Sequence, residues 1–273
     1  MTHTARENGY RLGLEIARIG CLFRLRDREL AQELGQKYDA FRSPSAASVV
    51  ADVIVDRSLS QHEPRTIKTT EVDGALNFES YNFAGRVSPD RRRATLRVAR
   101  EWEAFDAFLR VLYSVLLPMR GGLLVHASAL GRQGRGLIFT GPPEAGKTTV
   151  VRLSGGDSII GDELIAVRRM EGHVRAFITP FWNEPHLAKS FATDVPARAL
   201  FLLRQDRRTY LEPLSSIDAS VAMLPNVFYE PEHSGLSQDA LDALGGILEE
   251  TECYRLHFLP EAEQLWGCID ELV

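Results

Sequence analysis

A glycine-containing stretch near the middle of the chain, GPPEAGKTT, has the composition and spacing of a loop that wraps a nucleotide phosphate. Its two glycines let the backbone turn and approach an anion closely, Lys147 reaches the outer phosphates, and the hydroxyl of Thr148 is a ligand for Mg²⁺. An apolar, strand-like segment precedes the stretch and a helix-compatible segment follows it, as the motif requires. We therefore expect a nucleotide and Mg²⁺ as cofactors, and the loop does not determine the base. The expected nucleotide-binding residues are Gly141, Pro142, Pro143, Glu144, Ala145, Gly146, Lys147, Thr148 and Thr149.

Two adjacent acids, Asp162 and Glu163, follow this loop in the stretch SIIGDELIAV. Successive side chains of a strand point to opposite faces, so both acids can face one site only where the strand kinks, and Gly161 makes a kink plausible. A site that uses ATP needs a carboxylate for Mg²⁺ and a base for the acceptor hydroxyl. We expect Asp162 to be the base or a metal ligand, with Glu163 and Thr148 as further metal ligands. A surface turn built on Gly-Asp is the alternative interpretation.

His126 lies in the strand-like segment GLLVHASAL, before the loop. A single histidine in a strand is usually a packed or hydrogen-bonded core residue. Its position just upstream of the loop also makes it a candidate catalytic residue, together with Asp162 and Lys147. The residues alone leave both interpretations open.

The composition is that of an ordinary folded protein. Its 273 residues are 44% hydrophobic and 25% charged, which is enough to bury a full core. The net charge of −5 provides no bulk attraction for nucleic acid, and the longest apolar stretch, 111–125, is interrupted by proline, arginine and glycine. The first ten residues contain no apolar signal core, and the three cysteines are not at metal-ligand spacing. We expect a cytoplasmic protein with no nucleic-acid or membrane partner.

The pattern of apolar residues divides the chain into a β-rich subdomain over 1–100 and a mixed α/β domain over 101–273. The chain is of the α/β (α+β) class. In the second part, two strands over 122–130 and 137–141 form a hairpin whose second strand leads into the loop. Ser237 is a well-placed N-cap. The expected helices are 27–41, 101–117, 146–153, 215–228, 237–251 and 261–272, and the later strands are 158–169, 174–181, 197–205, 209–215 and 253–260.

The order of these features resembles the catalytic domain of the HPr kinase/phosphorylase superfamily. The resemblance is carried by HASALGRQGRGLIFTGPPEAGKTT followed by SIIGDELIAV, and it covers roughly 120–270, with 122–167 as its best-defined part. It implies a mixed-sheet P-loop kinase domain related to phosphoenolpyruvate carboxykinase. It also implies ATP-dependent phosphorylation of a serine hydroxyl on a protein or peptide. Asp162 would match the catalytic acid/base, Glu163 its neighbouring acid, and His126 the supporting histidine.

This chain departs from that pattern in several places. HPr kinases usually carry Asp-Asp and Lys-Ser where it has Asp162-Glu163 and Lys147-Thr148, and their later glycine-rich stretch is replaced by Thr179–Asn183. The whole layout is more similar to HPr-kinase-related proteins found beside peptide-modification systems. Some of those relatives phosphorylate a serine of a lasso-type precursor peptide.

Three functions remain open at this stage. The first is a kinase for a serine or threonine hydroxyl of a peptide or small protein. The second is a kinase for a small molecule such as an amino acid, and the third is a nucleotide-binding scaffold with little turnover. The sequence does not determine the acceptor, and it leaves a homo-oligomer open.

Overall fold

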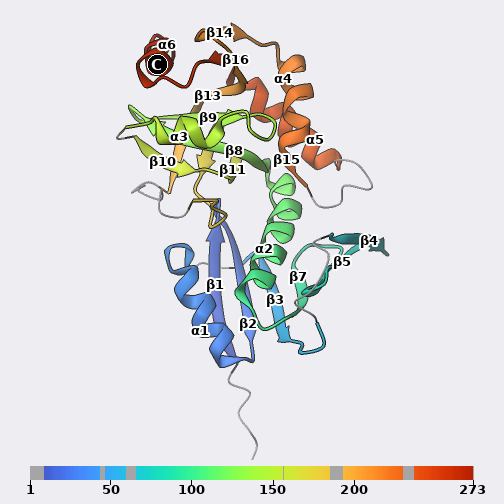
Figure 1. Cartoon of the computed structure of the whole chain (residues 1–273). Helices are drawn as coiled ribbons and strands as arrows, with labels where there is room; N and C mark the ends of the chain where they lie inside the picture. Colours follow the sequence, from blue (N-terminus) through green and yellow to red (C-terminus); the bar gives the residue numbers. More distant parts are fainter. Residues whose placement is uncertain are drawn as a thin grey trace, which may run out of the picture. The chain divides into compact units, whose positions relative to one another are not determined.

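The computed structural model describes residues 9–43, 47–59, 66–155, 157–184, 193–229 and 237–272. It is a mixed α/β structure with two sheets, and each sheet contains both parallel and antiparallel strand pairs (Figure 1). The chain divides into two compact units, one of residues 1–112 with 230–233 and the other of residues 113–229 with 234–273. The polar segment expected to lack a signal core lies almost wholly outside the described residues.

The first unit is built on a seven-stranded sheet in its described part, with the strand order β1-β2-β3-β7-β6-β5-β4. Its second strand pairs in parallel with β3, and β3 with β7, whereas the remaining neighbours are antiparallel. The strands are β1 (Tyr10–Ile16), β2 (Ile19–Leu25), β3 (Val49–Val55), β4 (Lys68–Val72), β5 (Ala75–Glu79), β6 (Phe83–Val87) and β7 (Arg93–Val98).

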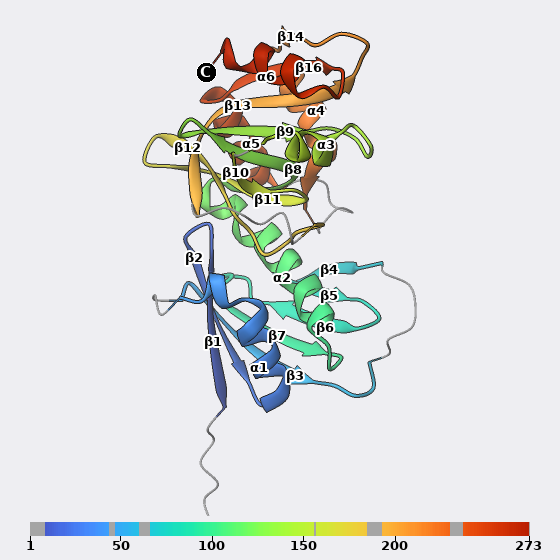
Figure 2. The same ribbon diagram turned by 60° about the vertical axis from the view of Figure 1, so that its left-hand side comes forward.

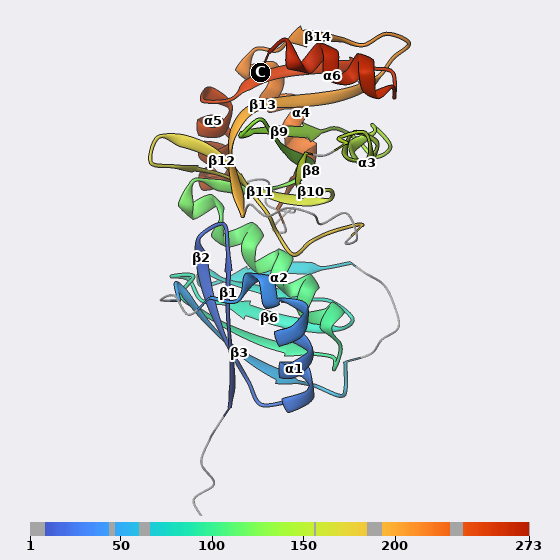
Figure 3. The ribbon, with the colours of Figure 1, turned by 90° about the vertical axis from the view of Figure 1, so that its left-hand side faces the viewer.

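Two helices, α1 (Arg28–Lys37) and α2 (Trp102–Leu116), pack on the same face of this sheet (Figures 2 and 3). The carboxylate of Asp27 caps α1 by accepting from the Leu30 N–H at 2.8 Å. Phe105 of α2 contacts the ring of Phe23 with 4.9 Å between centroids, so helix and sheet share one aromatic core. The boundary between the two units falls inside α2.

The second unit has a nine-stranded sheet in its described part. Strands β8, β9, β13, β16 and β14 lie side by side in that order, with parallel pairing only from β9 to β13 and from β13 to β16. The other edge of β8 pairs with β10 and β11, β12 joins β11 to β13, and β15 pairs with β8. The strands are β8 (Gly122–Arg132), β9 (Arg135–Thr140), β10 (Ser158–Gly161), β11 (Leu164–Met170), β12 (His173–Phe177), β13 (Asp194–Gln205), β14 (Tyr210–Pro213), β15 (Val227–Phe228) and β16 (Glu252–Phe258).

Helices cover both faces of this second sheet. One face carries a core that includes buried residues of α4 (Ser216–Met223) and α5 (Gln238–Glu249). The other face carries a core that includes α3 (Lys147–Arg152) and α6 (Ala262–Asp270), as Figure 3 also shows. Short 3₁₀ turns lie at Asp39–Phe41, Pro118–Arg120 and Leu224–Asn226. Among the described residues, no helix has the length and hydropathy to cross a bilayer.

Most predicted elements are confirmed, and the Ser237 side chain caps α5 as expected. Two differ. The helix predicted over 215–228 ends at Met223, because Pro225 lies in a 3₁₀ turn and has no N–H to continue an α-helix. The strand predicted over 174–181 ends at Phe177. Strands β1, β4 and β15 were not predicted. In β4 the mostly exposed side chains show no apolar alternation, and β15 has only two residues.

A glycine substitution in the first unit tests the packing of α2 on its sheet. A Cβ atom on Gly85 would lie 2.6 Å from a ring carbon of Phe108, so Gly85→Val should lower the free energy of unfolding by about 1–3 kcal/mol. Gly35→Ala in α1 is the matched control, since no atom lies within 4 Å of the added methyl group. Urea denaturation measures both, and equal stability of the two variants would show that this contact is not tight.

Candidate functional site

The predicted phosphate loop follows β9 directly, at the end of the sheet where the parallel strands β9, β13 and β16 have their carboxyl ends. Gly141 and Gly146 adopt φ of 151° and 108°, values that residues with a Cβ rarely adopt. A Cβ atom on Gly146 would lie 2.5 Å from Cζ of Phe258 in β16. Glycine at this position is therefore required both by the backbone conformation and by the aromatic ring beside it.

Glu144 is the acidic residue inside the loop. It has a positive φ of 64° and is exposed. Its carbonyl oxygen accepts a hydrogen bond of 2.8 Å from the side-chain amide of Gln205, the last residue of β13. This contact fixes the loop backbone to the neighbouring parallel strand.

Lys147 is the first residue of α3, and its side chain folds back over the loop. The ammonium Nζ donates to the carbonyl oxygens of Gly141 at 2.7 Å and of Pro142 at 3.1 Å. Burial lowers the pKa of Lys147. An anion entering the loop would compete with two neutral carbonyl groups for this ammonium group.

The two acids lie where the strand beside β8 is interrupted. β10 and β11 both pair with β8, and the register shifts between Ile159 and Gly161, as expected from the kink at this glycine. Asp162 follows directly and is only 3% exposed. Glu163 is half-buried, and its carbonyl oxygen accepts from the Ala127 N–H at 3.0 Å.

The carboxylate of Asp162 anchors a distant backbone segment. One oxygen accepts from the N–H of Asn183 at 3.1 Å and the other from the N–H of Glu184 at 2.7 Å. Burial nevertheless raises the pKa of Asp162, and the nearby carboxylates of Glu163 and Glu184 raise it further. Asp162 is therefore a proton acceptor stronger than an ordinary aspartate, held in a fixed orientation.

Strand β8 connects the loop with the acids. The hydroxyl of Ser128 donates to the carbonyl oxygen of Lys147 at 3.1 Å, and the next residue, Ala129, pairs with Gly161. His126, two residues earlier on the strand, pairs with Leu164, which follows the acids. Its ring also contacts Phe228 of β15, with 5.7 Å between centroids. The structure thus brings His126, the start of α3 and the two acids to the same stretch of β8, while the roles predicted for them remain predictions.

The sequence interpretation missed the segment that Asp162 holds. The Thr179 side chain donates to the carbonyl oxygen of Leu164, and Glu184 forms an ion pair with Arg152 of α3. Phe181 of this segment is buried in the core. The sequence here shows only two polar residues, Asn183 and Glu184, after two aromatic residues. This pattern does not indicate that their backbone N–H groups bind Asp162, about twenty residues earlier.

A Mg²⁺ site at Thr148, Asp162 and Glu163 remains a prediction. Within the described ranges, no group of three or more His, Cys, Asp or Glu residues is arranged to hold a metal ion. The proposed donors are a hydroxyl and two carboxylates, which are the oxygen ligands that Mg²⁺ prefers, and Mg²⁺ commonly retains several waters. Each Asp162 oxygen accepts one N–H and keeps further acceptor capacity. The donor set therefore fits Mg²⁺ chemically.

Comparison with known proteins gives little further information. No protein family model matches the chain, and no curated protein matches it. Among solved structures, the HPr(Ser) kinase/phosphatase from Coxiella burnetii is similar at 14% sequence identity and a TM-score of 0.27, over 33% of this chain and 70% of that chain. A TM-score at this level does not establish a shared fold, so the chemistry of the site has to be judged from the residues of this chain.

The anchoring role of Asp162 can be tested without any ligand. In Asp162→Asn one carboxylate oxygen becomes an NH₂ group that cannot accept from the backbone, so the amides of Asn183 and Glu184 should exchange about tenfold faster or more. Hydrogen exchange at these amides measures the effect, with the amides of α5 as an internal control. Unchanged exchange at Asn183 and Glu184 would show that other contacts hold the segment.

Proposed function

We propose that this protein is an ATP- and Mg²⁺-dependent phosphotransferase that phosphorylates a serine or threonine hydroxyl of a peptide or small protein. The observation that supports it is a single arrangement around β8. A phosphate-type loop with Lys147 at the start of α3 is joined through Ser128 to the stretch of sheet that carries Asp162. Residues suited to bind a triphosphate and a residue suited to accept a proton thus lie beside the same strand.

In this proposal the loop holds the donor nucleotide. The backbone from Gly141 to Gly146 can present N–H groups to the phosphates because both glycines adopt conformations that permit close approach. Lys147 exchanges its two carbonyl partners for the β- and γ-phosphates, a stronger charge-assisted contact. Thr148, Asp162 and Glu163 are the residues that would hold Mg²⁺, which would neutralise charge on the phosphates.

Asp162 takes the proton of the acceptor. The acceptor oxygen forms a bond to the γ-phosphorus, the bond from that phosphorus to the oxygen bridging it to the β-phosphate breaks, and the hydroxyl proton passes to the Asp162 carboxylate. A raised pKa suits this role, because it makes the carboxylate a better base. The N–H groups of Asn183 and Glu184 keep the carboxylate oriented, and His126 supports the acid pair from β8.

One observation favours a second candidate, a nucleotide-binding protein with little turnover. Both oxygens of Asp162 already hold backbone N–H groups, so the residue could serve only to fix the segment ending at Glu184. Arg152 of α3 also binds Glu184, which links that segment to the helix after the loop. Such a protein would signal nucleotide occupancy through this segment rather than transfer phosphate.

Two substitutions separate binding from transfer. Asp162→Asn should reduce phosphate transfer by about 100-fold or more while ATP still binds, and Lys147→Ala should weaken ATP binding by about tenfold or more. Transfer is measured with γ-labelled ATP and serine-containing peptides, and binding by calorimetry. Lys68→Ala, in the first unit, is the control for loss of a lysine charge.

The result also distinguishes the two candidates. Full transfer by Asp162→Asn would refute the assignment of the base. ATP binding by the wild type without labelled product from any peptide or amino acid would support the second candidate.

The pKa of Asp162 sets the pH dependence. Because its charged form must accept the proton, kcat/KM should fall with decreasing pH through a pKa above the ordinary aspartate value. Glu184→Gln removes a neighbouring negative charge but keeps the backbone N–H, so it should move this inflection to lower pH. The pH profile of kcat/KM measures the shift, and an inflection that stays in place or moves upward would contradict the assignment.

A further inference from the structure

The first strand of the first unit has an open edge. β1 is the outermost strand, and the two-residue turn of Ala17 and Arg18, with φ of 50° and 59°, makes Ile16 and Ile19 a hydrogen-bonded pair. Since bonded and non-bonded pairs alternate, Gly13 and Arg11 direct their N–H and C=O groups away from β2. The Gly13 carbonyl confirms this direction, because it accepts from the Ser43 N–H at 3.1 Å.

The chain itself extends part of this edge. Arg42 forms an antiparallel bridge with Leu14, and the Ser43 backbone approaches so closely that a Cβ atom on Gly13 would lie 2.3 Å from its carbonyl oxygen. This half of β1 therefore already accepts an extended segment. The other half of β1 contains Arg11. No backbone group of the described residues pairs with the outward edge there.

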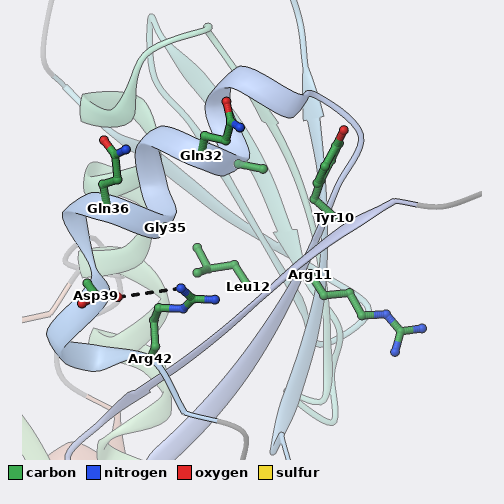
Figure 4. Close-up of a pocket in the computed structure, with 9 residues that line it drawn as sticks. Tyr10, Arg11, Leu12, Gln32, Gly35, Gln36, Asp39 and Arg42 are labelled. Atoms are coloured by element: carbon green, nitrogen blue, oxygen red, sulfur yellow. Dashed lines mark ion pairs between the residues drawn. The ribbon is translucent and has the colours of Figure 1, made fainter.

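Two grooves lie on either side of this open half, and Figure 4 shows the first of them. The first, the helix-side groove, has a volume of about 700 Å³ and is bounded by Leu12 and by Ala31 and Gly35 of α1. The second, the open-face groove, has a volume of about 970 Å³ and is bounded by Arg11 and Arg24 among others. In Figure 4, Leu12 points towards α1 and Arg11 points to the other side. A strand added beside β1 would therefore place alternate side chains in the two grooves.

The two grooves differ in chemistry. Three arginines line the open-face groove, Arg11, Arg24 and Arg26, against one carboxylate, Asp52. Arg24 and Asp52 form an ion pair of 2.7 Å, so the groove keeps a net positive charge that favours acidic side chains. The helix-side groove is mainly polar, and besides Leu12, Ala31 and Gly35 its lining includes Gln32, Gln36, Asp39 and Arg42. No atom lies within 4 Å of a methyl group added to Gly35, which leaves room for a side chain of the added strand.

We infer that the edge of β1 at Arg11 binds an extended peptide in which acidic residues alternate with uncharged residues. The peptide adds a strand to the sheet, with main-chain hydrogen bonds to Arg11, acidic side chains in the open-face groove and uncharged side chains in the helix-side groove. The surface lies within the first unit, and its occupancy does not depend on nucleotide binding or phosphate transfer. A second copy of the chain, paired β1 to β1, is the competing occupant.

The test uses the full chain and a fluorescein-labelled peptide of alternating Glu and Val. Fluorescence anisotropy should show saturable binding at peptide concentrations up to about 1 mM, and the bound peptide should slow hydrogen exchange at the Arg11 amide. The same residues arranged as a Glu block and a Val block are the control for non-specific charge attraction. Equal binding of the block peptide would overturn the inference, and so would the absence of saturable binding.

Two matched pairs of variants locate the site. Gly35→Gln should fill the helix-side groove and weaken binding about tenfold, whereas Gly245→Gln, at an equally open helical glycine of α5, should leave it unchanged. Arg11→Ser should weaken binding by a similar factor, and Arg93→Ser, an exposed arginine of β7 outside the groove, should not. An equal loss in Gly245→Gln, or no loss in Gly35→Gln and Arg11→Ser, would contradict the inference. Concentration-dependent dimerisation that Gly35→Gln abolishes would assign the edge to a second copy instead.

Discussion

Backbone pairing along both edges of β8 is the constraint on which the candidate site depends. One edge pairs with β9, which leads directly into the loop. The other edge pairs with β10 and β11, and Asp162 and Glu163 are the two residues that connect these strands. A shift of this register by one residue would turn the side chains of β8 to the opposite faces. Ser128 would then lose its contact with the carbonyl oxygen of Lys147. The positions of the loop and the acids are thus set by a strand that contains few of the expected site residues itself.

The buried carboxylate of Asp162 shows how structural and chemical roles can coincide. Desolvation disfavours its charge, and two backbone N–H groups favour it. These opposing effects keep the acid ionisable but give it a higher pKa than an ordinary aspartate. The same hydrogen bonds fix the segment that ends at Glu184. Glu184 also forms an ion pair with Arg152 of α3, the helix that follows the loop. The segment that Asp162 holds is therefore also linked to α3.

The sequence predicted those features that neighbouring residues determine. The loop, its flanking strand and helix, the capped helices and the β8–β9 hairpin all follow from local patterns. It did not predict the partners of Asp162, because the N–H groups of Asn183 and Glu184 come from a separate segment and carry no side-chain signal. The open edge of β1 was not predicted either, because the order of strands in a sheet depends on pairing between segments that are distant in the sequence. The short strand β15 was missed for the same reason. Its two residues form a strand only because they pair with β8.

The central claim is that the loop from Gly141 to Thr148 binds nucleotide phosphates, and a structure determined with Mg²⁺ and a non-hydrolysable ATP analogue tests it most directly. We expect the β- and γ-phosphates to lie in the loop, with Nζ of Lys147 turned from the carbonyl oxygens of Gly141 and Pro142 towards them. A nucleotide bound elsewhere, or no nucleotide and Lys147 still donating to those two carbonyls, would contradict the account.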